Sequence, residues 1–65
     1  MSQEDASLLA KCLPVIEQGA RTVGELATSA WHRGDHNRTA VMGQRENDLR
    51  NLAREIRDHL GMPRA

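Results

Sequence analysis

The sequence predicts an all-α fold: a helical hairpin that completes its core as a homodimeric four-helix bundle. Apolar residues recur at helical spacing in two long segments, and a polar stretch containing Gly34 separates them. No stretch alternates polar and β-branched residues as a strand does. We therefore expect one domain over the 65 residues. Its parts are a first arm at about 3–33, a loop at 34–37, a second arm at about 38–60 and a tail at 61–65.

Length and composition favour association. A chain of 65 residues buries only about 60% of its unfolded surface and is marginally stable alone. The single Cys12 excludes an internal disulfide, and no signal peptide is recognisable, so we expect a reducing cytoplasm. No apolar run is long enough to predict a membrane span. Nine basic residues balance nine acidic ones, so the whole chain has no strong attraction for nucleic acid.

The first arm should begin near residue 3, because Ser2 is a suitable N-cap followed by Glu4 and Asp5 in the first turn. Its apolar residues then alternate steps of three and four, which is a heptad seam. The alanines of this seam would let a second helix approach closely. The seam residues that we predict to form core or interface are Leu9, Leu13, Ile16, Ala20, Val23 and Ala27.

Two features predict that this arm is kinked or broken between Pro14 and Thr22. Proline inside a helix lacks the amide that would bond to the carbonyl of Ala10, and its ring clashes with that turn. Gly19 could end one helix, and Thr22 with Glu25 forms a capping box that could open another.

The connection should follow Trp31, which we expect to cover the open end of the core. Gly34 can end the first arm, and either Asp35 or Asn37 can cap the second. At the far end, Gly61 permits a left-handed C-cap and Pro63 prevents continuation of the helix.

The second arm carries an apolar stripe about 100° wide. Arg45 falls inside this stripe, so either its stem passes the core to reach solvent or its guanidinium meets a carboxylate. Charged residues flank the stripe. They are expected either to be a solvated face with ion pairs such as Glu46 with Arg50, or to orient a docked helix. The stripe residues that we predict to form core or interface are Met42, Leu49, Leu52, Ile56 and Leu60.

The sequence predicts neither a cofactor nor a metal site. His32, Asp35 and His36 are close along the chain, but Gly34 disfavours the helix that would align them as ligands. Cys12 is expected to be a buried small apolar residue. No strand-turn-helix elbow or Cys-His arrangement supports a nucleophile, so we do not expect an enzyme.

The segment Arg-Thr-Val-Gly-Glu-Leu-Ala at 21–27 resembles the entry to the second helix of winged helix-turn-helix repressors of the ArsR and MarR type. Residues 13–19 resemble the end of their preceding helix. The resemblance implies DNA binding, with Arg33, Arg38 and Arg45 near phosphate. The pattern departs from the family after residue 30, because a Gly-Asp loop replaces the recognition helix and no wing strands follow.

These observations predict a small regulatory or adaptor protein that acts by protein–protein interaction through helical faces and binds a second copy of itself. Another helical protein is a possible partner. The first alternative is a nucleic-acid-binding transcriptional regulator with a helix-turn-helix-like segment at 13–33. The second alternative is a small helical chaperone or secretion co-factor.

Overall fold

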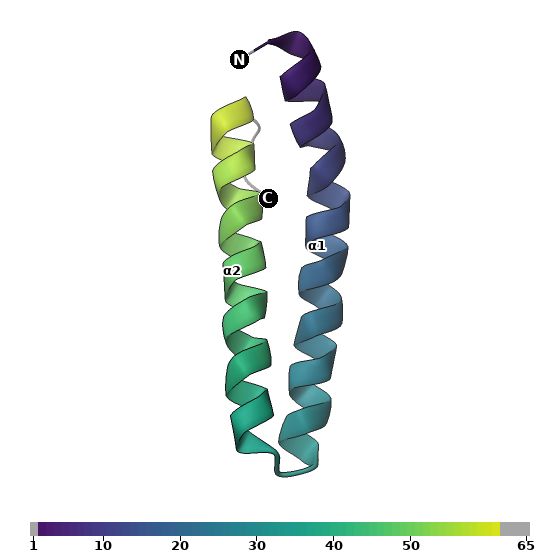
Figure 1. The fold of residues 1–65 in the computed structure, drawn as a ribbon, viewed down its shortest axis with the longest axis vertical. Coiled ribbons are helices and arrows are strands. Elements are labelled where there is room, and N and C mark those ends of the chain that lie inside the picture. Colours follow the sequence, from purple (N-terminus) through teal and green to yellow (C-terminus); the bar gives the residue numbers. More distant parts are fainter. Residues whose placement is uncertain (1, 62–65) are drawn as a thin grey trace.

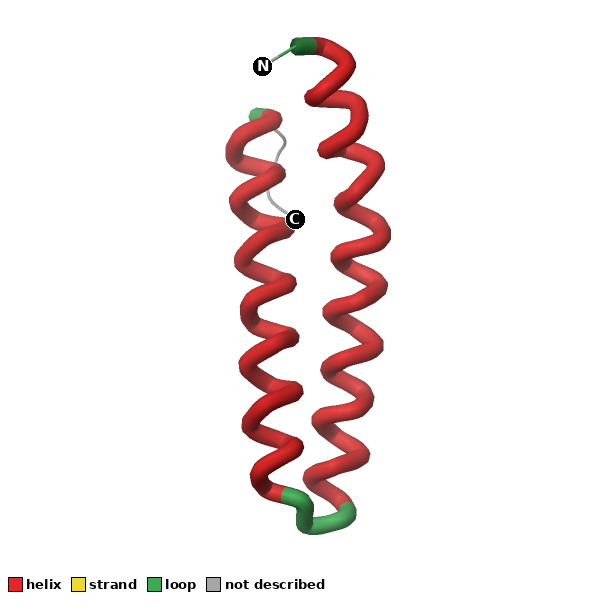
Figure 2. The backbone as a smooth tube through the Cα atoms, in the orientation of Figure 1, coloured by secondary structure: helices red, strands yellow, loops and turns green. Residues whose placement is uncertain are grey.

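The protein is a hairpin of two long antiparallel α-helices that lie side by side (Figures 1 and 2). In the computed structural model, which describes residues 2–61, α1 spans Gln3–His32 and α2 spans His36–Leu60. The Cα atoms extend over 46 × 17 × 15 Å, so the molecule is a narrow rod. The predicted all-α hairpin is confirmed. Residues 62–65 of the predicted tail, including Pro63, lie outside the described residues.

Both helices begin at the side-chain caps that the sequence offers. The hydroxyl of Ser2 accepts a hydrogen bond from the amide of Asp5 at 3.1 Å. Asp35, and not Asn37, caps α2, because its carboxylate accepts from the amide of Arg38 at 3.0 Å. The second helix therefore begins two residues earlier than the sequence predicts, at His36.

The connector is only three residues long, Arg33 to Asp35. Gly34 has a φ of 76°, a left-handed conformation that glycine adopts without strain. The carbonyl of Ala30 accepts from the amide of Arg33 at 3.2 Å and from that of Asp35 at 2.9 Å. At the other end of α2, Gly61 supplies the left-handed C-cap with a φ of 71°.

The expected break in the first arm is wrong, because α1 is one continuous helix through Pro14, Gly19 and Thr22. The alternative, a kink at Pro14, stays a prediction. Pro14 and Ala10 are both exposed, so water can reach the turn at which the proline removes a backbone hydrogen bond. In the seam on either side of Gly19 and Thr22, Ala20 is buried and Ile16, Val23 and Ala27 are half-buried. Packing of these residues on α2 favours a helix that continues through Gly19 and Thr22.

The interior of the hairpin is a single row of mostly small side chains. Leu13 and Ile56 are its largest buried members, and Ala30 has no exposed surface. Ala20 and Ala53 are also buried, whereas Leu9, Ile16 and Leu60 pack against this row and remain partly exposed. The other predicted seam residues that are half-buried are Val23, Ala27, Met42 and Leu49. Because each helix has only one neighbour, most apolar side chains are covered on one side only.

The seam of α2 is rotated relative to the predicted stripe. Leu52 is 44% exposed and lies outside the row between the helices, where Ala53 is buried instead. Arg45, which the sequence places in the stripe, is exposed, and the half-buried Glu46 takes the seam position. The alanine and the glutamate allow the helices to pack closely, and this rotation turns the larger Leu52 outward.

Two further expectations are corrected. Trp31 does not cover the end of the core: it is 60% exposed, and its ring meets the ring of His36 edge-on at a centroid distance of 5.6 Å. Ala30 closes that end of the interior instead. Cys12 is exposed and not buried, because it lies beside the seam and not in it.

Candidate protein-interaction faces

Contacts between the helices define which flank of α1 lies next to which flank of α2. Glu17 of α1 forms an ion pair and a hydrogen bond with Arg57 of α2. The carboxylate of Glu46 lies so close to Gly24 that a Cβ at this glycine would be 2.6 Å from its Oε2. Both contacts lie on one side of the seam. We call this side the charged face.

The opposite side of the hairpin carries exposed apolar residues from both helices. At 100° per residue, Leu8, Val15 and Leu26 lie about 160° to 180° around α1 from Glu17. Val41 and Leu52 lie about 140° to 160° around α2 from Arg57. We call the surface formed by these five residues the apolar face. The five side chains thus line a single surface and are not scattered around the molecule.

The apolar face is exposed to an unusual degree for such large side chains. Val15 has 72% of its surface accessible, and Leu8, Leu26, Val41 and Leu52 are also exposed. Exposed single apolar residues are normal, whereas several large ones on one side of a molecule indicate an interaction surface. Cys12 lies on the same flank of α1, between Leu8 and Val15, and adds a free thiol to this surface.

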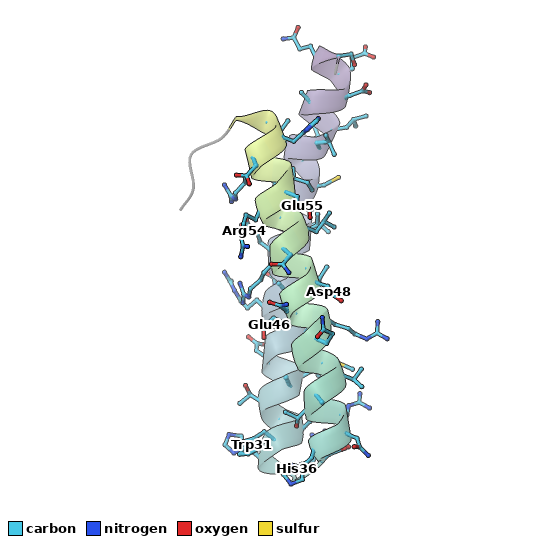
Figure 3. The ribbon with its side chains drawn as sticks, turned by 90° about the vertical axis from the view of Figure 1, so that its left-hand side faces the viewer. Trp31, His36, Glu46, Asp48, Arg54 and Glu55 are labelled. Atoms are coloured by element: carbon cyan, nitrogen blue, oxygen red, sulfur yellow. The ribbon has the colours of Figure 1, made fainter. Side chains whose placement is uncertain are left out.

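The charged face is hollowed into a groove of about 460 Å³ between the helices. We call it the arginine groove. Its small apolar lining consists of Ala20, Leu49 and Ala53. Its charged lining consists of Glu17, Arg21, Arg50, Arg54 and Arg57, four cations with one acid. Figure 3 shows Glu46 and Arg54 projecting to one side of α2 and Asp48 and Glu55 to the other.

Two of the four arginines of the groove are held by carboxylates. Arg50 donates from Nε at 3.1 Å and from Nη2 at 2.8 Å to Oε2 of Glu46, one turn earlier. Arg57 is held by Glu17 across the helix interface, and three quarters of its side chain is buried there. Its stem therefore covers part of the interior while its charge stays at the surface.

The residues of the DNA-binding alternative are not arranged as the resemblance implies. Residues 13–32 belong to the single helix α1, so the turn of a helix-turn-helix is absent from this segment and that expectation is wrong. Arg33, Arg38 and Arg45 are exposed, but they are distributed over the connector and the first three turns of α2. They do not line the arginine groove.

Within residues 2–61, no group of three or more histidine, cysteine or acidic side chains is placed to hold a metal ion. His32, Asp35 and His36 surround the connector, where His36 contacts Trp31 and Asp35 is engaged as the cap of α2. Among the same residues, neither α1 nor α2 has the length of uncharged apolar sequence that crossing a bilayer requires.

The sequence predictions missed both the Glu17–Arg57 pair and the groove. Forty positions separate the two partners, so only the alignment of the helices shows that they meet. The sequence nevertheless contains information on this alignment, because a short turn at Gly34 sets Ala30 opposite Thr39. Counting residues along both helices away from the turn then places residue 20 at the level of residue 49.

Comparison of the chain with protein-family models, with curated proteins and with solved structures finds no match. The apolar face and the arginine groove are therefore the observations on which function must be argued.

Proposed function

We propose that this hairpin is a small non-enzymatic interaction module that binds a second copy of itself through the apolar face and acts as a regulatory or adaptor protein. The observation that carries the proposal is the one-sided exposure of Leu8, Val15, Leu26, Val41 and Leu52. Two hairpins stacked on this surface form a four-helix bundle. In a reducing cytoplasm, the expected location, the thiol of Cys12 stays free within the contact.

The dimensions of the hairpin suit such a contact. The apolar face runs from Leu8 to Leu26 of α1, which is about 27 Å of a hairpin 46 Å long. Association would bury side chains that each stabilise a contact by about 1.5–3 kcal/mol when fully removed from water. A chain of this length gains from a second copy the core that it lacks alone.

Charges along the apolar face favour two copies with their connectors at opposite ends. Arg45 lies toward the connector, and Glu55 lies toward the open end of the same helix. In the antiparallel dimer, Arg45 of one copy lies above Glu55 of the other. A parallel dimer would instead bring the two copies of Arg33 and Arg38 together and repel.

The test is sedimentation equilibrium over a range of concentrations, with circular dichroism on the same samples. We expect a folded dimer for the unmodified chain. Val15→Asp combined with Leu52→Asp should yield a monomer, because each copy of the chain would then bury two carboxylates without partners in the dimer interface. Trp31→Ala is the control, since Trp31 is equally apolar and exposed but lies on the side of Glu46 and Arg54 (Figure 3).

A folded monomer for the unmodified chain at all concentrations would refute self-association. A weakly helical monomer would instead favour the co-factor alternative, in which the same face is covered by a larger helical protein and the hairpin orders only on binding.

A further inference from the structure

We infer that the arginine groove binds an acidic segment of another protein. The groove lies on the side of the hairpin opposite the apolar face, so a second copy seated on the apolar face leaves it open. The inference therefore goes beyond the proposed self-association and does not depend on it.

The charges of the groove are not balanced by its own acids. Arg50 is paired with Glu46, and Arg57 is paired with Glu17. Within residues 2–61, Arg21 of α1 and Arg54 of α2 form no ion pair, although both line the groove. Guanidinium groups prefer the planar, bidentate geometry of a carboxylate. The guanidinium groups of Arg21 and Arg54 therefore remain available for acidic ligands.

The spacing of these two arginines favours an extended ligand over a small anion. Gly19 lies opposite Leu49, where a Cβ would be 3.8 Å from Cδ1 of the leucine. Counting along both helices from this level, the backbones of Arg21 and Arg54 are offset by about 10 Å along the hairpin. A chain that carries several carboxylates can meet both arginines, whereas a single oxyanion at one of them leaves the other unused.

The floor of the groove suits a polypeptide. Ala20, Leu49 and Ala53 present small apolar groups between the cations, against which aliphatic side chains can pack. The volume of about 460 Å³ falls within the range of about 300–1,000 Å³ that is usual for binding clefts. A short acidic segment with interspersed alanine or leucine would therefore match both the charge and the surface.

The same features disfavour nucleic acid. A nucleic acid is held mainly by many cations along its phosphate backbone. The chain has no net charge, and within residues 2–61 the groove offers only two arginines without an ion pair. Single strands bind by stacking bases on aromatic rings. The one tryptophan, Trp31, is at the connector end of the hairpin and is not part of this lining.

The experiment is a fluorescence-anisotropy titration of the full chain, at low salt, with a labelled peptide of alternating glutamate and alanine. We expect saturable binding that is absent for the same peptide with glutamine in place of glutamate. Arg21→Gln combined with Arg54→Gln should weaken binding about tenfold, because the peptide loses both guanidinium groups that are not already held by an acid of the hairpin. Both residues are exposed, so circular dichroism should show an unchanged helix content.

The matched control is Arg33→Gln combined with Arg38→Gln, which removes the same charge from outside the groove. The affinity of this variant should stay within about twofold of the unmodified chain. Equal losses in the two double variants would overturn the assignment, because they would show attraction to net charge alone. Absence of binding to the glutamate peptide would also overturn it, as would displacement of the peptide by a single-stranded oligonucleotide of equal charge at lower concentration.

Discussion

The apolar face and the charged face are built from the same two helices and flank the same seam, yet they are completed differently. On the charged face, long side chains close the flank: Arg57 lies across the interface to Glu17, and Glu46 lies against Gly24. On the apolar face, Val15 and Leu52 extend into solvent. The hairpin therefore covers one side of its narrow core with long charged side chains and leaves large apolar side chains exposed on the other.

The difference teaches how a thin fold divides its surface. A two-helix layer has one buried row, so side chains just outside this row stay exposed unless a long side chain or another molecule covers them. On the charged face, arginine stems cover part of the interior. Branched apolar residues on the other side have no polar end to hydrate, and only association removes them from water.

The substitution with the largest expected effect disrupts the apolar face and the charged face together. Leu49→Asp combined with Ile56→Asp should unfold the chain, because both side chains belong to the seam under the two faces and Ile56 is buried. The cost of placing two carboxylates there exceeds about 4 kcal/mol. Far-ultraviolet circular dichroism should show loss of helix. The exposed pair Ala40→Asp and Asn47→Asp is the control and should remain folded.

An intermediate effect separates the two orientations of the proposed dimer. Arg45→Glu or Glu55→Arg alone should weaken self-association severalfold, since each places like charges across the antiparallel contact. The double variant should recover most of the loss. Sedimentation equilibrium measures the three dissociation constants. Two single variants that both associate like the unmodified chain would exclude the antiparallel arrangement and point to connectors at the same end.

The smallest expected effect is a change in stability on replacing one glycine on each side of the seam by alanine. Gly19→Ala should raise the free energy of unfolding by about 0.5–1 kcal/mol, because alanine favours the helix and its methyl group would make an ordinary contact with Leu49. Gly24→Ala should gain less, since its methyl group displaces the carboxylate of Glu46 from its position beside Arg50. Urea unfolding of both variants at matched oligomeric state provides the comparison. A larger gain for Gly24→Ala would contradict the close packing described for the charged face.

Much of the fold follows from local signals in the sequence. These signals are short-range features that determine the structure of their own segment. They are the apolar steps of three and four from Leu9 onward, the caps at Ser2 and Asp35, and Gly61. Pro14 does not end α1, because the cost of a proline depends on whether its turn faces water. That depends on the partner helix and not on the local sequence.

The rotation of α2 and the charged face could not be predicted in the same way. The hydrophobic pattern does not distinguish Leu52 from Ala53, whereas close packing of the helices buries the smaller residue and leaves the leucine exposed. The Glu17–Arg57 pair and the groove depend on the relative alignment of two helices. This alignment is a property of the folded hairpin, and no single segment of the chain contains it.

The three-residue connector also has a consequence for how the molecule folds. Since Arg33 to Asp35 brings Ala30 next to the start of α2, the first contacts between the helices close a very small loop and lose little chain entropy. Each following helical turn can then pack next to contacts that have already formed. Helical proteins with such local contacts fold on the microsecond-to-millisecond scale. Leu9 and Leu60 pack against the buried cluster of Leu13, Ala53 and Ile56, in the half of the hairpin away from the connector. Amide hydrogen exchange should therefore be slowest around this cluster and fastest in the terminal turns of the two helices.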